Sequence, residues 1–391
     1  MKHLVLCRTF APMIGGIERY TSELFARAGL DVEIVAPNVP GAMGFDAQAP
    51  YRVSRYFYDA RWARGKIPLL PLTLNALPRA LRVRPAVLFS DQVQTGGVGL
   101  PISRLTGARH VVFAYGMELT PKRLYRFKRT VFRRSDAVIA ISEFTRNALI
   151  AVYGVHPDKV WLVRPGVDTS RFTPPQRNGG HRHRLGLASD DQVVLTVGRL
   201  ESSHNYKGYD RVIRLLARLL PEFPGLLLVV AGDGTDRPRL EGLAGALGVT
   251  GRVKFAGRVT DNDLASLYQC ADLFVLPSGA PDSDPFKAEG YGIVYAEASA
   301  SGVPCVAYRL GGTNDVIEDG VTGVLTNPDE TSLFSAVRKL LSDSDGRIQM
   351  GRAARVRATR ELGWDSAVAS LHALVRHLTD IKQPLGELRP Q

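Results

Sequence analysis

Two cationic side chains follow an apolar run in the second half of the chain. Arg199 and Lys207 come directly after residues 193–197, in a loop that also contains Gly198 and Gly208. Cations at the carboxyl end of a strand, beside glycines that allow close backbone approach, can hold a diphosphate. Surface charges without a ligand are the alternative that this spacing leaves open.

Two glutamates flank a glycine-containing segment further along the chain. We expect Glu289 in a loop, a helix that begins near Gly292 and ends before Gly302, and Glu297 on that helix. The first turn of a helix presents free N–H groups and the positive end of its dipole to a phosphate. The residues between the glutamates are mostly apolar, which argues against a solvated helix face.

The elements that must position these residues form two successive series of strands and helices. Strands alternating with helices indicate a parallel sheet with right-handed crossovers. The first series has a helix at 17–28 after Gly15-Gly16, and the second has one at 209–220. Strands are expected at 4–6, 32–36, 87–89, 110–113, 138–141 and 160–163, and then at 193–197, 226–231, 253–255, 273–276, 303–307 and 323–325.

The predicted fold class is therefore α/β, with two facing, doubly wound parallel-sheet domains. Ligands of such sheets bind outside the carboxyl ends of the strands, which places the expected site in the cleft between the domains. The expected boundaries are 1–172 for the first domain, 173–190 for a linker rich in Pro, Gly and basic residues, and 191–363 for the second domain. A last helix is expected at about 364–380, and residues 383–391 are expected to be a disordered tail.

Composition narrows the classes of protein. Apolar residues make up 45% and charged residues 23% of the 391 residues, and no apolar run approaches the roughly 20 residues of a spanning helix. Three scattered cysteines argue against a disulfide framework or a zinc site and favour a reducing cytoplasm. The net charge of +12 favours anionic partners such as phosphates or anionic lipid headgroups. Nucleic acid is disfavoured, because no zinc-finger spacing or aromatic RNA-binding motif is present.

Taken in order, the motifs resemble those of the family-4 retaining glycosyltransferases of GT-B fold. The resemblance spans residues 5–325, and the stretch 289–298 is most similar to bacterial mannosyltransferases that act on phosphatidylinositol mannosides. The matching motifs are Pro12-Met13-Ile14-Gly15-Gly16-Ile17-Glu18, Arg164-Pro165-Gly166-Val167-Asp168 with Arg171-Phe172, Gly198-Arg199-Leu200 with Lys207-Gly208, Ala231-Gly232-Asp233-Gly234, Glu289 to Glu297, and Ala300-Ser301-Gly302-Val303-Pro304.

The resemblance implies a role for each matching residue. Arg199, Lys207 and Glu289 would be catalytic, with the two cations stabilising the leaving diphosphate and Glu289 holding hydroxyls of the transferred hexose. Glu297 would take the ribose hydroxyls, and Val259 would lie beside the base. Backbone of Gly16, Gly292, Ile293 and Val294 would meet the phosphates. It also implies that the second domain binds the nucleotide sugar, that the first lies on the acceptor side, and that the last helix packs back on the first domain.

The implied reaction is retaining, metal-independent transfer of a hexose, mannose or glucose, from a GDP- or UDP-sugar to an acceptor hydroxyl in glycolipid, polysaccharide or other glycoconjugate synthesis. No cofactor is expected, and GDP-mannose is favoured only by the match around Glu289. Asp282-Ser283-Asp284 is a rival pattern for a metal, although two cations on the diphosphate would make an ion redundant.

One position departs from the family pattern. Tyr115, in Phe113-Ala114-Tyr115-Gly116-Met117-Glu118, stands where a histidine is usual, and His110 is too early in the strand to replace it. Tyr115 and Glu118 are assigned to the sugar or acceptor side. The departure keeps open a non-catalytic nucleotide-sugar-binding protein, and the fold keeps open a sugar-nucleotide epimerase or a phosphorylase.

A basic, amphipathic segment at 122–134 suggests the acceptor side of the protein. Seven Lys and Arg residues alternate there with apolar ones. Such a helix could rest on an anionic membrane, which would make the acceptor lipid-linked and the protein peripheral on the inner face of the membrane. A helix packed on its own domain with solvated arginines is the other interpretation. An anionic acceptor also fits this charge.

Overall fold

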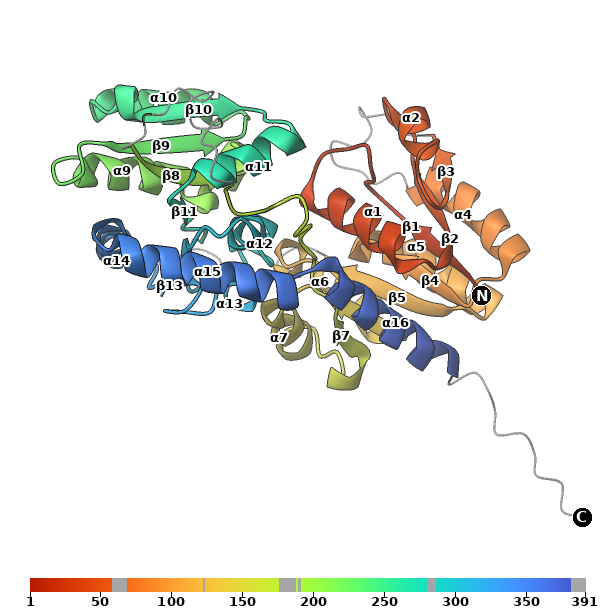
Figure 1. Ribbon diagram of the computed structural model, residues 1–391. Helices are drawn as coiled ribbons and strands as arrows, with labels where there is room; N and C mark the ends of the chain where they lie inside the picture. The colour runs from red at the N-terminus through yellow and green to blue at the C-terminus, as the bar shows by residue number, and fades with distance from the viewer. Residues whose placement is uncertain (58–68, 122–123, 176–187, 189–190, 280–285, 381–391) are drawn as a thin grey trace, which may run out of the picture. The chain divides into compact units, whose positions relative to one another are not determined.

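The computed structural model describes residues 1–391 except 58–68, 122–123, 176–187, 189–190, 280–285 and 381–391. The chain divides into two compact units (Figure 1). The first comprises Met1–Pro165 and Trp364–Gln391, and the second comprises Gly166–Gly363. The sequence analysis had instead placed 166–172 with the first domain. Among the described residues, no helix combines the length and the apolar character that crossing a membrane requires.

The first unit is built on a seven-stranded parallel sheet in the order β3-β2-β1-β4-β5-β6-β7. The four-residue strands β4 and β6 are buried along their whole length, as expected for a parallel sheet covered by helices on both faces. The strands are β1 (Lys2–Leu6), β2 (Asp31–Pro37), β3 (Arg52–Tyr56), β4 (Val87–Ser90), β5 (Arg109–Ala114), β6 (Ala137–Ala140) and β7 (Val160–Leu162).

The second unit is built on a six-stranded parallel sheet in the order β10-β9-β8-β11-β12-β13. All six residues of β9 are buried. The strands are β8 (Gln192–Val197), β9 (Leu226–Ala231), β10 (Val253–Gly257), β11 (Leu273–Val275), β12 (Cys305–Tyr308) and β13 (Gly323–Thr326). In their own numbering the order is 3-2-1-4-5-6-7 in the first sheet and 3-2-1-4-5-6 in the second, and in both the direction of winding reverses beside the first strand.

Helices flank both sheets. In the first unit they are α1 (Gly16–Ala28), α2 (Ala42–Asp46), α4 (Leu69–Val83), α5 (Val93–Thr106), α6 (Tyr125–Arg134), α7 (Glu143–Ala151) and α16 (Trp364–Asp380), with short 3₁₀ turns η1 (Met117–Leu119) and η2 (Pro157–Lys159). In the second unit they are α9 (Tyr209–Leu219), α10 (Arg237–Ala246), α11 (Asp261–Cys270), α12 (Ile293–Ala300), α13 (Thr313–Val316), α14 (Glu330–Ser342) and α15 (Ser344–Arg360), with 3₁₀ turns η3 (Ser202–Lys207) and η4 (Thr250–Arg252).

Helix α5 packs on β4 and β5 over glycines. A Cβ atom on Gly99 would lie 2.3 Å from Ser90 Oγ and 2.7 Å from His110 Nε2, so only glycine fits there. The imidazole of His110 bridges Ser90 Oγ at 3.0 Å and Ser135 Oγ at 2.9 Å. Burial lowers the pKa of His110 to about 4, so the ring is neutral near pH 7. This residue therefore ties β4, β5 and the end of α6 together.

The last helix, α16, belongs to the first unit and packs against α1. Trp364 stacks on Tyr20 with ring centroids 6.2 Å apart, and His372 Nε2 lies 2.7 Å from Ala28 O. The buried side chains of α16 include Trp364, Leu371 and Leu374, which belong to the apolar face that its sequence predicts. Together α1 and α16 cover one part of the first unit's sheet.

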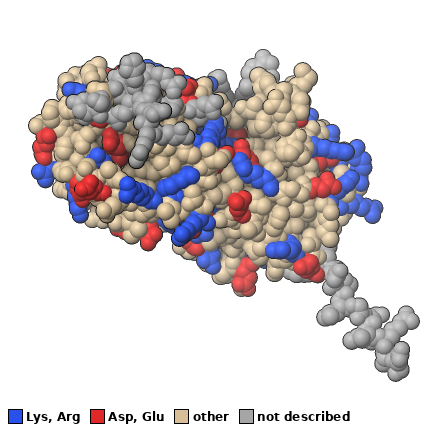
Figure 2. Space-filling model, in the orientation of Figure 1, with Lys and Arg blue, Asp and Glu red and all other residues tan. Residues whose placement is uncertain are grey.

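Most predicted elements match the observed ones to within one or two residues at each end. Strand β3 was not predicted, because Arg-Val-Ser-Arg-Tyr has little apolar character and lies at the sheet edge. The three cysteines are buried and free. The tail 383–391 and most of the linker 173–190 lie outside the described residues. On the face shown in Figure 2, basic and acidic side chains are interspersed.

Candidate functional site

The second sheet reverses its winding between β8 and β11, which lie side by side. At such a point the loops after the two neighbouring strands run to opposite faces of the sheet and leave a crevice at their carboxyl ends. The loop after β8 contains Arg199 and Lys207, and the segment after β11 contains Ser278, Glu289 and Gly292. The topology therefore brings the two strongest sequence motifs to one place.

Lys207 and Glu289 form an ion pair there, although 82 residues separate them. Lys207 Nζ lies 3.1 Å from Glu289 Oε2 and 3.3 Å from Oε1. Ser278 Oγ donates a hydrogen bond to Glu289 Oε2 at 3.3 Å. Each charged side chain is only about one-sixth exposed, at 16% for Lys207 and 17% for Glu289. The pair is therefore largely shielded from solvent.

Arg199 extends from the same loop and is exposed. Among the described residues, the structure gives it no ion pair, so its charge is available to an anion. Burial, followed by the positive charges of Arg199 and Lys207, lowers the pKa of His204 in η3. Arg199 and Lys207 thus supply positive charge at this loop, which can hold a diphosphate.

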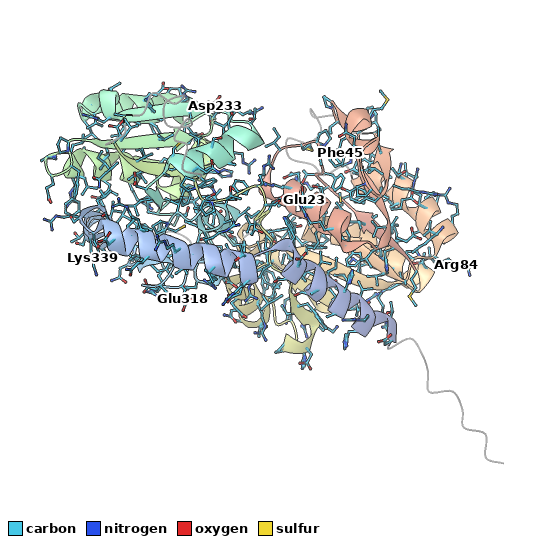
Figure 3. All side chains as sticks on the ribbon, viewed as in Figure 1. Glu23, Phe45, Arg84, Asp233, Glu318 and Lys339 are labelled. Carbon is cyan, nitrogen blue, oxygen red and sulfur yellow. The ribbon has the colours of Figure 1, made fainter. Side chains whose placement is uncertain are left out.

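The loops after β8 and β9 are hydrogen-bonded to each other. Leu200 N donates to Asp233 O at 3.0 Å, and Asp233, labelled in Figure 3, follows β9 directly. Gly232 has a φ of 142°, and a Cβ atom there would lie 1.8 Å from Gly198 O. The motif Gly232-Asp233-Gly234 therefore lets the backbone of the Arg199 loop approach that of β9.

Helix α12 begins in the same segment, a few residues after Glu289. Gly292 precedes the helix with a φ of 97°, and the free N–H groups of the first turn belong to Ile293 and its neighbours. Gly312 N donates to Glu289 O at 2.7 Å, so the loop after β12 supports the segment before the helix. Sequence reasoning missed Gly312, for which a glycine pair directly after a buried strand was the available signal.

Glu297 lies within α12 and is 2% exposed. Its Oε2 accepts a hydrogen bond from the Tyr268 hydroxyl at 3.1 Å. Val259 follows β10 and is half-buried, and its assignment to the base stays a prediction. The rival metal pattern at 282–284 lies outside the described residues.

In the first unit, the winding reverses between β1 and β4. Gly16 begins α1, and the Glu18 side chain folds back so that a Cβ on Gly15 would lie 2.1 Å from its Oε2. Asp91 follows β4, is fully buried, and accepts hydrogen bonds from Arg8 N at 3.0 Å and Thr95 Oγ1 at 2.9 Å. Burial raises the pKa of Asp91 to about 7. Sequence reasoning missed Asp91, an acidic residue directly after a buried strand.

Tyr115 and Glu118 occupy the loop after β5. The Tyr115 ring stacks on Phe113, and its hydroxyl lies 3.4 Å from Thr21 Oγ1 on α1. Burial raises the pKa of Tyr115, so the phenol stays neutral. Glu118 accepts a hydrogen bond from Tyr115 N, and it also accepts from the backbone of Gly116. In this structure Glu118 thus holds its own loop, and Tyr115 packs between β5 and α1.

Family comparisons agree with this arrangement. Residues 180–357 match the glycosyl transferases group 1 family, and residues 14–171 match glycosyltransferase family 4. A GDP-mannose-dependent alpha-(1-6)-phosphatidylinositol monomannoside mannosyltransferase of Mycolicibacterium smegmatis is 31% identical over 97% of this chain and 100% of its own length. A D-inositol 3-phosphate glycosyltransferase of Xylanimonas cellulosilytica is 35% identical over 62% of this chain and 57% of its own.

Among solved structures, the Anabaena protein HepE in complex with UDP and glucose has a TM-score of 0.80. Its sequence identity is 21%, over 96% of this chain and 99% of that chain. Two Rossmann-like parallel-sheet units and this likeness define the fold class as GT-B. The chain belongs to the family-4 glycosyltransferases. Its activity is the transfer of a hexose from a nucleotide sugar to an acceptor hydroxyl.

Proposed function

We propose that this glycosyltransferase transfers mannose from GDP-mannose, with retention of configuration and without a metal ion, to an acceptor that carries a phosphate. The observation that carries the proposal is the Lys207–Glu289 pair beside the amino terminus of α12. Lys207 and the free N–H groups of α12 can bind the diphosphate of a nucleotide sugar and the negative charge that develops on it. The carboxylate of Glu289 can accept hydrogen bonds from the hexose.

In the proposed mechanism the residues act on charge and position. As the bond between the hexose and the diphosphate breaks, new negative charge appears on the leaving phosphate. Lys207, Arg199 and the first turn of α12 stabilise that charge, and each such donor is typically worth about 3 kcal/mol. Glu289 accepts hydrogen bonds from hexose hydroxyls, and Glu297 accepts them from the ribose. The leaving phosphate oxygen takes the proton of the attacking hydroxyl on the same face of the sugar, which yields retention.

The choice of donor and acceptor rests on the relatives. The Mycolicibacterium enzyme is named for GDP-mannose and phosphatidylinositol monomannoside, and the Xylanimonas enzyme for D-inositol 3-phosphate. Both acceptors carry a phosphorylated inositol. The net charge of +12 favours such an anionic acceptor. We therefore propose inositol phosphates and their lipids as the acceptor class.

The test incubates the purified chain with GDP-mannose or UDP-glucose and with inositol phosphates or phosphatidylinositol mannosides, with and without EDTA. Proton NMR of the product gives the anomeric configuration. We expect an α-mannosyl product in both conditions and no transfer by Lys207→Ala. A β-linked product would contradict retention, and loss of activity with EDTA would contradict metal independence. Donor binding without transfer to any acceptor would favour the non-catalytic alternative.

We also propose that the protein is cytoplasmic and touches the inner face of the membrane through α6. Arg126, Arg129, Arg133 and Arg134 are exposed, and their spacing places them on one face of the helix. Sedimentation with phosphatidylglycerol vesicles should deplete the wild-type chain, and replacing these four arginines by glutamine should abolish the depletion. Equal depletion of both proteins would refute this contact.

A further inference from the structure

The Tyr268 side chain joins α11 to the buried glutamate of α12. Tyr268 is fully buried, and its hydroxyl lies 3.1 Å from both Glu297 Oε2 and Val294 O. Both acceptors belong to α12, the helix whose amino terminus is part of the candidate site. The two residues are 29 positions apart in the sequence and lie on different helices.

A phenol has one proton, so the two acceptors compete for it. Val294 O lies in the first turn of α12, where the backbone N–H four residues later already bonds to it. A carboxylate accepts more strongly than a backbone carbonyl, because hydrogen bonds to ionised groups are about twice as strong as neutral ones. The proton of Tyr268 is therefore directed to Glu297.

Aromatic packing fixes the ring that carries this hydroxyl. Tyr268 packs edge-to-face on Phe172, with centroids 5.7 Å apart, and against Phe274 at 5.8 Å. Such pairs prefer these tilted geometries, so the ring has little freedom to turn away from Glu297. The packing of the ring thus holds the hydroxyl in place.

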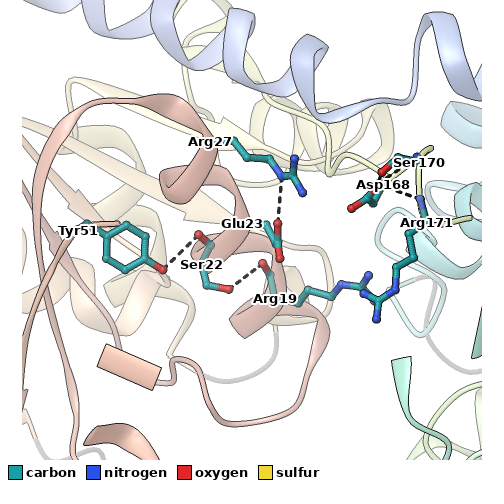
Figure 4. Close-up of polar contacts among 8 residues, drawn as sticks. All are labelled: Arg19, Ser22, Glu23, Arg27, Tyr51, Asp168, Ser170 and Arg171. Atoms are coloured by element: carbon teal, nitrogen blue, oxygen red, sulfur yellow. Dashed lines mark hydrogen bonds and ion pairs between the residues drawn. The ribbon is translucent and has the colours of Figure 1, made fainter. Parts of the chain in front are cut away.

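The segment that carries Phe172 is itself immobilised. Asp168 Oδ1 accepts hydrogen bonds from Ser170 N at 3.1 Å and Arg171 N at 3.2 Å, which closes a turn (Figure 4). Arg355 Nη1 donates to Phe172 O at 2.7 Å and to Ala300 O at 2.6 Å. The guanidinium of Arg355 therefore links the Phe172 segment by hydrogen bonds to the end of α12, the helix that carries Glu297.

We propose that Tyr268 is a positioning residue that orients the carboxylate of Glu297 toward the ribose hydroxyls of the donor. The hydrogen bond from Tyr268 to Oε2 limits the orientations that the Glu297 carboxylate can take. The inference rests on the proposed function, because it takes Glu297 as the acceptor of the ribose hydroxyls. Without the phenol, the Glu297 side chain has more than one orientation and the ribose loses part of its recognition.

The test measures how strongly each protein distinguishes GDP from 2′,3′-dideoxy-GDP by calorimetry, with UDP and its dideoxy form as the second pair. The readout is the ratio of the two dissociation constants. We expect the wild type to prefer the ribonucleotide. Tyr268→Phe should lower that preference roughly fivefold to tenfold, which is the upper part of the range for one net intramolecular hydrogen bond. Glu297→Gln should lower it at least as much. Dideoxy-GDP should bind equally to wild type and Tyr268→Phe.

Tyr295→Phe is the matched control. Tyr295 is also fully buried, lies on α12, and donates its hydroxyl to Leu276 O at 2.6 Å instead of to Glu297. It should lose stability like Tyr268→Phe and keep the wild-type ribose preference. With GDP-mannose, Tyr268→Phe should raise KM while kcat stays within about twofold, since the reacting bond is elsewhere.

The outcomes distinguish the positioning role of Tyr268 from the assignment of Glu297 to the ribose. If Glu297→Gln loses the ribose preference and Tyr268→Phe keeps it, the positioning role of Tyr268 is wrong and the donor site stands. If Glu297→Gln keeps the ribose preference while GDP still binds, the ribose assignment in the proposed function is wrong. Equal loss in Tyr268→Phe and Tyr295→Phe would reduce Tyr268 to a packing residue.

Discussion

Replacing Glu289 by glutamine should increase the affinity for the free nucleoside diphosphate. In the structure Lys207 Nζ directs hydrogen bonds to both oxygens of Glu289, at 3.1 and 3.3 Å. A diphosphate must bind to Lys207 in the presence of this carboxylate. Glutamine keeps the shape of the side chain and removes its negative charge, so Lys207 is released and the repulsion disappears.

The magnitude follows from the burial of the pair. Two unit charges 4 Å apart interact by about 4 kcal/mol at an effective dielectric constant of 20, and a net hydrogen bond to a charged group is worth about 1.5–3 kcal/mol. Because the pair is partly exposed, we take the lowest of these values, about 1.5 kcal/mol, which corresponds to roughly a tenfold change in Kd. We expect Glu289→Gln to bind GDP about tenfold more tightly and Lys207→Ala about tenfold more weakly.

Titration calorimetry of GDP at two salt concentrations measures this effect, and raising the salt should narrow the difference between the variants. Glu289→Gln should at the same time transfer hexose more slowly, because hexose hydroxyls lose an ionised acceptor. Weaker or unchanged GDP binding by Glu289→Gln, in a protein of unchanged melting temperature, would refute the view that the pair competes with the diphosphate.

Three further predictions concern stability and metal. Folding raises the pKa of Asp91 from 3.8 to about 7, so its contribution to the free energy of unfolding is complete below about pH 4 and falls by up to about 4 kcal/mol as the pH rises to 7. Asp91→Asn should remove this part of the pH dependence of stability, measured by urea unfolding. An unchanged pH dependence in the variant would contradict the prediction. Gly232→Ala, whose Cβ would meet Gly198 O at 1.8 Å, should destabilise the second unit by at least about 3 kcal/mol, measured as a fall in urea midpoint, with the unhindered Gly242→Ala as control. Exhaustive EDTA treatment should change neither GDP binding nor kcat, and restoration of lost activity by Mg²⁺ would show that an ion is needed.

The sequence predicted the parts of the site that depend on local pattern. Apolar runs located the strands, and the loops after β8 and β11 could be named because parallel strands present their carboxyl ends at one edge. The pairing of Lys207 with Glu289 follows from that edge. The sequence therefore predicts that Lys207 and Glu289 lie near each other, but it does not predict that they form an ion pair.

Other features depend on contacts that no pattern shows. Asp91 receives a hydrogen bond from a backbone N–H 83 residues earlier, and Tyr268 reaches a glutamate 29 residues later. In sequence, Asp91 resembles any acidic residue after a strand, and Tyr268 resembles any aromatic residue on a half-buried helix. Glu118 was assigned to the sugar side from its position, and only the structure shows its carboxylate bonded to the backbone of its own loop.

The assignment of α16 to the first unit has a consequence for how the chain is made. The ribosome synthesises α1 before Gly166–Gly363 and α16 after it. Until α16 has been synthesised, the face of the Tyr20 ring that stacks on Trp364 is uncovered, whereas the six described strands of the second unit are already present. Nascent chains should therefore contain a folded second unit and an incomplete, aggregation-prone first one. A stop codon just before Trp364 would leave that state permanent, and such a product should depend on chaperones or be degraded.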